Sequence, residues 1–202
     1  MEKQLRKIVD KYKPAFSKGG KFGFLHSTFD AFETFLFVPN TVTRRGSHIR
    51  DANDLKRTMI IVIIALLPAL LFGMYNVGYQ HFAAIADPVS QAMWFKCWWY
   101  GFVRMLPMIL VSYIVGLGIE FAVAQHKGEE VNEGFLVTGL LIPMIMPIDI
   151  PLWILALAVA FSVVFGKEVF GGTGMNVFNP ALLARAFVFF AYTPKISGEQ
   201  VW

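Results

Sequence analysis

Two charged residues lie inside strongly apolar stretches of the sequence and are the first candidates for chemistry. Glu120 is near the end of the apolar run 105–124, and Arg185 is within the run 180–192. Because an ionised side chain in a lipid bilayer is costly, such residues often mark an ion path. Glu120 is close enough to the end of its run to reach lipid headgroups, whereas Arg185 is harder to explain in that way. Both are ion-path candidates, and Arg185 is expected to pair with a carboxylate, such as Glu120 or Glu168, or with a ligand oxygen.

A glycine-rich loop, residues 167–179, leads directly into the last apolar run. Asn179 followed by Pro180 is typical of a helix start, with asparagine as the N-cap and proline at the first helical position. The positive end of that helix would face the loop, whose glycines allow backbone N–H groups to approach a ligand. An ordinary tight turn with a cap explains the same residues. Ligand binding and a simple turn both remain open here.

Other motifs carry little chemistry. Ser47, His48 and Asp51 are neighbours on a polar segment without the context of a catalytic triad, so hydrolysis is not expected. Cys97 is the single cysteine, which excludes an internal disulfide, and the scattered histidines imply no metal site. One Asn-Pro-Ala tripeptide, residues 179–181, keeps a channel in consideration, although aquaporins pair two copies.

The composition is that of a membrane protein. Of 202 residues, 56% are hydrophobic and 16% are charged, a balance tilted beyond that of an ordinary soluble domain. Twelve of the eighteen Lys and Arg residues precede Met59, so the net charge of +4 describes the amino-terminal part. The positive-inside rule then predicts a cytoplasmic amino terminus, and anionic lipid rather than nucleic acid as the partner of this basic part.

Five apolar segments follow, each expected to be a helix of an all-α polytopic membrane domain, residues 58–202. A bilayer core of about 30 Å needs roughly 20 helical residues. The third and fourth segments are short for full spans, and Gly139, Pro143 and Pro147 predict a broken third helix. Trp94, Trp98, Trp99 and Tyr100 predict an aromatic belt ahead of the second segment. The expected segments are about 58–77, 105–124, 134–148, 150–166 and 180–192.

Residues 1–57 form a basic amphipathic arm. Two apolar stripes at helical spacing predict helices that lie on the cytoplasmic membrane surface, and a small packed soluble arm is the alternative. The first ten residues carry five charges and no apolar core of a cleavable signal, so the amino terminus is expected to be retained. The stripes are Leu5, Ile8, Val9 and Tyr12, and then Phe29, Phe32 and Leu36.

Three motifs, in order, resemble the B-subunit family of the Na+-translocating NADH:quinone reductases, to which the D-type member of the Rnf complex is related. They are Gly-Ser-His-Ile-Arg-Asp-Ala-Asn-Asp-Leu-Lys-Arg at 46–57, Glu-Val-Asn-Glu-Gly-Phe at 130–135, and Lys-Glu-Val-Phe-Gly-Gly-Thr-Gly at 167–174 with Asn-Pro-Ala-Leu at 179–182. The likeness covers nearly the whole chain from about Phe29. A D-type member of an Rnf complex and a urea-type channel or transporter are the alternatives.

The resemblance implies a membrane subunit of a multi-subunit redox pump in the bacterial inner membrane. Electrons would pass from NADH through flavins to quinone while Na+ is exported, and the chain would be inactive alone. Its partners would be the other subunits, quinone, Na+ and lipid. The family fold is a urea-transporter-like bundle of two inverted five-helix repeats, so this chain would supply the first repeat and the cytoplasmic arm.

The resemblance also assigns residues. Glu120 matches an acidic residue associated with Na+ passage, and Thr173, Asn176 and Asn179 fall in the region where noncovalent riboflavin is expected. Leu117 stands where a second glycine of a Gly-Gly pair is expected. The quinone-side candidates are Phe29, Phe32, Gly116 and Gly118, and the riboflavin candidates are Gly172, Thr173, Asn176 and Asn179.

The family also attaches FMN covalently to a threonine in a Ser-Gly-Ala-Thr motif. That motif is absent from this sequence, and Thr193, in Tyr-Thr-Pro-Lys, is no substitute. The FMN site is therefore expected beyond Trp202, in a longer chain that would also hold the second repeat.

Overall fold

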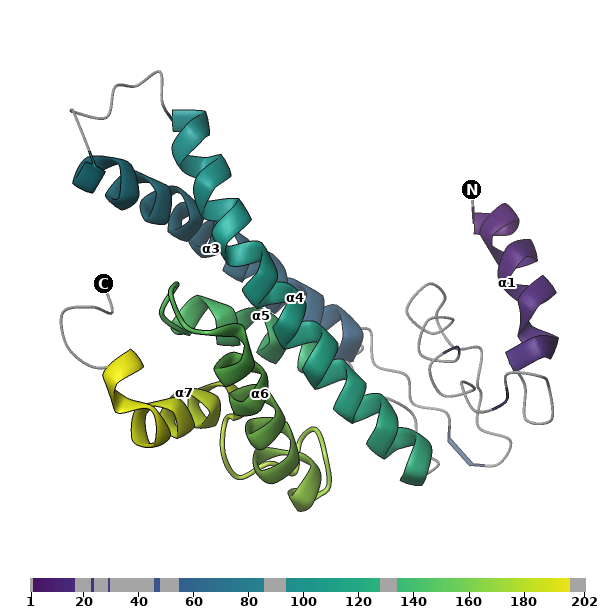
Figure 1. The fold of residues 1–202 in the computed structure, drawn as a ribbon. Coiled ribbons are helices and arrows are strands. Elements are labelled where there is room, and N and C mark those ends of the chain that lie inside the picture. The colour runs from purple at the N-terminus through teal and green to yellow at the C-terminus, as the bar shows by residue number, and fades with distance from the viewer. Residues whose placement is uncertain are drawn as a thin grey trace.

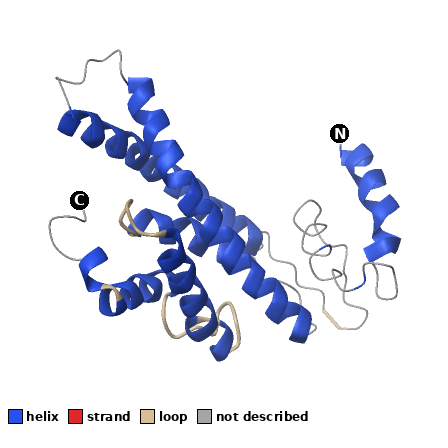
Figure 2. Cartoon of the chain, in the orientation of Figure 1, coloured by secondary structure: helices blue, strands red, loops and turns tan. Residues whose placement is uncertain are grey.

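The computed structural model of the chain describes residues 2–16, 23, 29, 46–47, 55–85, 94–127 and 134–196. All regular elements in these ranges are helical, and none is a strand (Figures 1 and 2). The α-helices are α1 (Glu2–Phe16), α3 (Leu55–Ile85), α4 (Trp94–Lys127), α5 (Phe135–Ile145), α6 (Leu152–Gly166) and α7 (Pro180–Ala191). Two short 3-10 helices, η3 (Glu168–Phe170) and η4 (Thr193–Lys195), follow α6 and α7. The all-α fold is confirmed.

Three helical stretches are long and apolar enough to cross a membrane: Thr58–Ile85, Trp94–Lys127 and Leu152–Phe170. The helices α5 and α7 have 11 and 12 residues. At about 1.5 Å per residue each is roughly 17 Å long, short of a bilayer core of about 30 Å. The prediction of five apolar helices is confirmed. Among the described helical stretches three are long enough for a full span and two helices are half-length, and the number of membrane crossings stays a prediction.

The helix boundaries differ from the predicted ones in three of the five helices: α3 runs to Ile85 instead of about 77, α4 spans Trp94–Lys127 instead of about 105–124, and α5 ends at Ile145 instead of about 148. Trp94 begins α4, so the aromatic residues expected ahead of the second span belong to its first two turns. Pro143 lies inside α5, which continues to Ile145, and the chain breaks only at the turn around Pro147. A proline breaks a helix by removing one N–H and crowding the preceding turn, and here α5 accommodates it two residues before its end.

The helix α1 is confirmed as a helix, and Phe29 stacks on Phe16 at its carboxyl end with ring centroids 4.9 Å apart. The second predicted stripe, with Phe32 and Leu36, lies outside the described residues. The cytoplasmic location of the arm and the urea-transporter-like repeat stay predictions.

The helices α3 and α4 form a long antiparallel pair (Figure 1). An added Cβ at Gly78 would overlap the backbone carbonyl of Cys97, and one at Gly101 would overlap that of Met74. Glycine at both points lets the two backbones touch, as small residues commonly do between membrane helices. The seam steps by four residues along each helix, through Leu70, Met74 and Gly78 on α3 and through Met105, Gly101 and Cys97 on α4.

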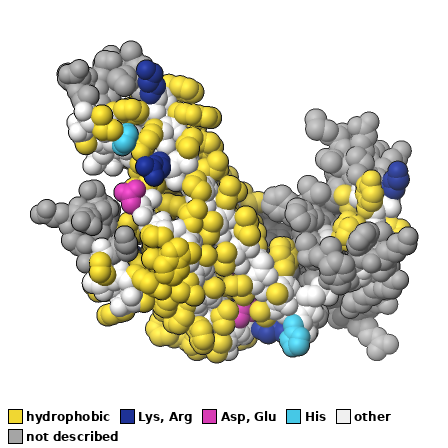
Figure 3. Space-filling view, in the orientation of Figure 1, with side chains coloured by type: hydrophobic (Ala, Val, Ile, Leu, Met, Phe, Trp, Pro, Cys, Tyr) yellow, Lys and Arg dark blue, Asp and Glu magenta, His cyan; other side chains and the backbone are white. Residues whose placement is uncertain are grey.

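A second layer packs on the other part of α4, where α5, α6 and α7 gather into a compact cluster (Figure 1). One stripe of α4 is buried along its length, at Cys97, Gly101, Met105, Met108, Ser112, Gly116, Glu120 and Ala124. The outward faces are strongly apolar, and hydrophobic side chains cover most of the described face in Figure 3. Phe190 is 81% exposed and Ile114 70%. Surfaces of this kind favour lipid over water, and the chain is a membrane protein.

Candidate functional site

Glu120 forms a buried ion pair with Lys167. The Lys167 Nζ donates to Glu120 Oε1, and the side chains of Lys167 and Glu120 are only 6% and 4% exposed. Glu120 comes from the last two turns of α4, and Lys167 directly follows α6. A second pair at the same end, Lys127 Nζ to Glu168 Oε2 at 3.5 Å, is more exposed, at 35% and 14%. Both carboxylates expected as partners of Arg185 therefore pair with lysines instead.

Arg185 takes a different partner from those predicted. Its Nη1 donates to the backbone oxygen of Ile145, the last residue of α5. The final carbonyls of any helix lack partners within the helix and carry the negative end of its dipole. Arg185 therefore stabilises the end of a half-length helix, which explains how its charge is tolerated in an apolar setting without a neighbouring carboxylate.

Replacing Arg185 by glutamine is expected to weaken the α5–α7 contact, because the amide loses the charge that complements the helix end. We expect a loss of about 1–3 kcal/mol of stability, the usual range for hydrogen bonds made by charged groups. The measurement is the unfolding temperature of the purified membrane complex, with Arg185→Lys as the variant that keeps the charge. An R185Q complex that is as stable as wild type and turns over normally would remove both this structural role and the ion-path hypothesis.

The glycine-rich loop is held by its own backbone and by two asparagines. Gly171, Gly172 and Gly174 have φ values of 110°, 95° and 92°, a region that favours glycine. Asn176 accepts from the Gly174 N–H at 3.3 Å and donates to the Phe178 oxygen at 2.9 Å. These bonds fix the loop in a single tight path ahead of α7.

Asn179 is the N-cap of α7, as predicted. Its Oδ1 accepts from the Ala181 N–H at 2.9 Å and from the Leu182 N–H at 3.4 Å, and Pro180 occupies the first helical position. The amino terminus of α7 is thereby fixed against the loop. The Asn179 Nδ2 makes no hydrogen bond to any described residue and remains available as a donor.

Replacing Asn179 by alanine is expected to destabilise α7 by about 0.5–2 kcal/mol, because two helical N–H groups lose their acceptor. Asn179→Asp retains the acceptor oxygen but not the Nδ2 donor, so it should restore stability without restoring any ligand contact made by that donor. Thermal unfolding of the two variants separates the roles. Equal stability of N179A and wild type would contradict the capping role.

A cavity of about 300 Å³ lies between this loop and the amino end of α5. The first residue before α5, Gly134, lies so close to Thr173 that an added Cβ would contact its methyl group at 2.7 Å. The positive ends of α5 and α7 both face this space. It is lined by Met59, Gly134, Val137, Thr138, Leu141, Lys167, Thr173, Asn176, Val177, Phe178, Asn179 and Pro180.

Three of the four riboflavin candidates, Thr173, Asn176 and Asn179, line this cavity together, and Gly172 is buried in the loop behind it. The buried Thr173 Oγ1 has no hydrogen-bond partner among the described residues. Buried hydroxyls are nearly always paired, so an unpaired one at a cavity wall fits a polar ligand atom. A small apolar cavity with a few convergent polar groups suits a flat heteroaromatic ring, at the lower end of the usual volumes of about 300–1,000 Å³.

No contact joins the quinone-side candidates that the structure describes, Phe29, Gly116 and Gly118. Gly116 is buried under the ring of Phe135, with which an added Cβ would overlap. The space beside Gly116 is therefore filled by this side chain of α5 and not left open for a quinone ring. Gly118 is exposed, with no described atom within 4 Å of an added Cβ. Phe29 lies beside α1, and Phe32 is outside the described residues. Their role in quinone binding stays a prediction.

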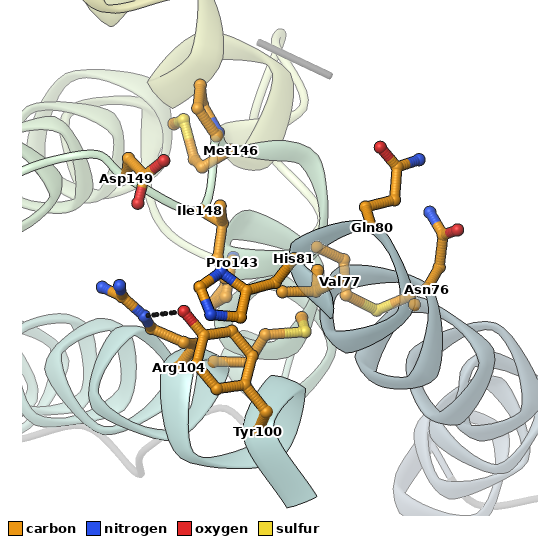
Figure 4. Close-up of a pocket in the computed structure, with 14 residues that line it drawn as sticks. Asn76, Val77, Gln80, His81, Tyr100, Arg104, Pro143, Met146, Ile148 and Asp149 are labelled. Carbon is orange, nitrogen blue, oxygen red and sulfur yellow. Dashed lines mark hydrogen bonds between the residues drawn. The ribbon is translucent and has the colours of Figure 1, made fainter. Parts of the chain in front are cut away.

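A second cavity, of about 460 Å³, lies among α3, α4 and the turn after α5 (Figure 4). His81 stacks on Tyr100 with ring centroids 4.1 Å apart, and Arg104 Nε donates to the Tyr100 hydroxyl at 3.1 Å. Asp149 lies on the opposite wall (Figure 4). The prediction from sequence missed this cavity. Its signal was the pair Tyr100 and Arg104, one helical turn apart in an apolar run.

The family model that matches this chain is described as the NQR2, RnfD, RnfE family, and the match covers residues 42–202. The chain is 43% identical over 219 residues to a protein of Pseudomonas aeruginosa (strain LESB58) that is named as the B subunit of Na(+)-translocating NADH-quinone reductase. Proteins of the same name from Azotobacter vinelandii (strain DJ / ATCC BAA-1303) and Chromohalobacter salexigens (strain ATCC BAA-138) are 42% and 43% identical.

Each of these alignments covers 98% of this chain, and 54%, 54% and 53% of the three relatives in the order given. The chain therefore spans about half the length of the curated relatives that it matches.

Proposed function

Because this chain belongs to the NQR2, RnfD, RnfE family, we propose that it is part of the membrane subunit of a Na+-translocating NADH:quinone reductase. In this proposal it works only within the complex, in the inner membrane and with its amino terminus in the cytoplasm. Its partners are the other subunits, quinone and Na+. The observation that carries the proposal is the cavity in which the candidate flavin residues meet an unpaired Thr173 hydroxyl.

The residues fit a riboflavin ring in chemical terms. The Thr173 hydroxyl and the Asn179 Nδ2 are free to bond ring oxygens and nitrogens, and Val137 and Leu141 supply apolar contact. The two helix amino termini make the surroundings electropositive, which favours added electron density on a ligand. Riboflavin would supply the electron-transfer chemistry, and the chain would position it and shape its electrostatics.

Of the two ion-path candidates, Glu120 is the better suited to contact Na+. Glu120 is the one buried carboxylate among the described residues, and a carboxylate oxygen is a suitable ligand for a hard cation. Arg185 is engaged with the end of α5. We therefore place the ion contact at Glu120 and give Arg185 a structural part in the path.

The test is the flavin content of the native complex that carries this chain. Acid-extractable riboflavin should be present, and Thr173→Val should weaken its retention about five- to tenfold, as expected for one lost hydrogen bond. The matched control is Thr193→Val, a threonine beyond α7 and outside the cavity. A complex without any extractable flavin would reject the proposed function, and retention unchanged in T173V would remove the riboflavin from this cavity.

A further inference from the structure

We infer that Lys167 is a positioning residue that links ion binding to the flavin cavity: Na+ at Glu120 takes the carboxylate away from the Lys167 ammonium, which then faces the cavity as an unneutralised charge. This inference rests on the proposed function and extends it. It assigns a role to a residue that lies outside the predicted ion path and the predicted riboflavin site.

The geometry places Lys167 in both sites at once. Its Nζ contacts Glu120 Oε1, and the same side chain lines the cavity that contains Thr173 and Asn179. Among the described residues, Lys167 is the one cation in that lining. Since both partners of the pair are almost fully buried, water does not screen a change in their charges as it would at the surface.

The charges explain why ion binding would be felt in the cavity. Among the described residues, Glu120 neutralises Lys167 in the structure. With Na+ bound to the carboxylate, the Lys167 ammonium at the cavity wall is no longer neutralised. That charge favours a reduced, negatively charged isoalloxazine ring over the neutral oxidised ring. The flavin midpoint potential should therefore rise when Na+ binds.

Thermodynamic linkage makes the effect reciprocal. If Na+ favours the reduced ring, reduction of the ring must strengthen Na+ binding by the same factor. We expect a factor of about ten, in the middle of the range for coupled sites. Electron arrival would then load the ion at Glu120, and electron departure would release it.

The second ion pair supplies a matched control. Lys127 and Glu168 pair at the same end of the bundle, with Lys127 Nζ 3.5 Å from Glu168 Oε2. Lys127 is more exposed than Lys167, and neither residue of this second pair lines the cavity. A Lys127→Met variant changes the charge of the protein as Lys167→Met does. Because Lys127 does not line the cavity, its loss should leave the coupling between Na+ and the flavin unchanged.

The experiment is a redox titration of the riboflavin in the native complex, with dithionite as the reductant, in NaCl and in choline chloride at equal ionic strength. Wild type and K127M should show a higher potential in NaCl. K167M should show a clearly smaller difference, because Na+ at Glu120 still adds a charge but no ammonium at the cavity wall loses its partner. E120Q/K167M, which removes both the proposed ion contact and the ammonium, should be insensitive to Na+ and serves if K167M fails to assemble.

Two results would overturn the inference while leaving the proposed function intact. One is a riboflavin midpoint potential in the wild-type complex that is the same in NaCl and in choline chloride. The other is a Na+ response in K167M, or in E120Q/K167M, as large as in wild type. A complex without riboflavin would instead reject the proposed function itself.

Discussion

Replacing Gly101 by valine should separate α3 from α4 and prevent the protein from accumulating in the membrane. A Cβ at this position would overlap the backbone carbonyl of Met74, and backbone atoms have no alternative rotamer to adopt. Gly78 on α3 approaches the backbone carbonyl of Cys97 on α4 in the same way, so both glycines are needed for the close contact between the two helices. If the helices separate, the side chains along the α3–α4 interface lose their packing contacts.

The measurement is the amount of the protein in purified membranes, together with the unfolding temperature of any complex that forms. Gly118→Val is the control, because it adds the same side chain to the same helix at a site with no described atom within 4 Å. Valine there should be tolerated. Equal accumulation of G101V and G118V would show that the α3–α4 contact does not depend on backbone approach.

Replacing Lys167 by methionine should destabilise the protein, with a loss of about 3–5 kcal/mol, because Glu120 is left as a buried and unpaired charge. Methionine fills a volume similar to that of lysine, so the loss of charge is the main change. The double variant E120Q/K167M removes both charges and should recover most of that loss, since a buried ion pair contributes little compared with a neutral replacement.

The test is the unfolding temperature of K167M, E120Q, the double variant and K127M in one detergent. K127M should lose no more than about 1 kcal/mol, because its ion pair is partly solvated. If the double variant were as unstable as the sum of the two single variants, Glu120 and Lys167 would not act as a pair. The assigned ion pair would then be wrong.

The local elements of this protein follow from local sequence. Five apolar runs became five helices, because a backbone in lipid must satisfy its hydrogen bonds internally. The Asn179 cap was predicted from the Asn-Pro pair alone, since capping depends only on neighbouring residues. The third segment was predicted to run to residue 148, but α5 ends at Ile145 because Pro147 holds the preceding Met146 in an extended conformation.

The partners of the charged residues did not follow from sequence. Glu120 and Lys167 are 47 residues apart, and Arg185 reaches the carbonyl of Ile145 from 40 residues away. Charge alone favoured a pair between Arg185 and a carboxylate such as Glu120 or Glu168. Which groups meet depends on how α4, α6 and α7 pack around α5, and no local pattern encodes that packing.

The sequence by itself determined the membrane class, the presence and order of the five apolar helices, the cap of α7 and the presence of costly charges in apolar runs. All of these depend on composition or on neighbours within about one helical turn. Only the tertiary structure decided that Gly116 accommodates Phe135, that Lys167 neutralises Glu120, and that Thr173 and Gly134 enclose one cavity. The physical reason is that burial and pairing are properties of several helices packed together, and each depends on distances that a single segment does not set.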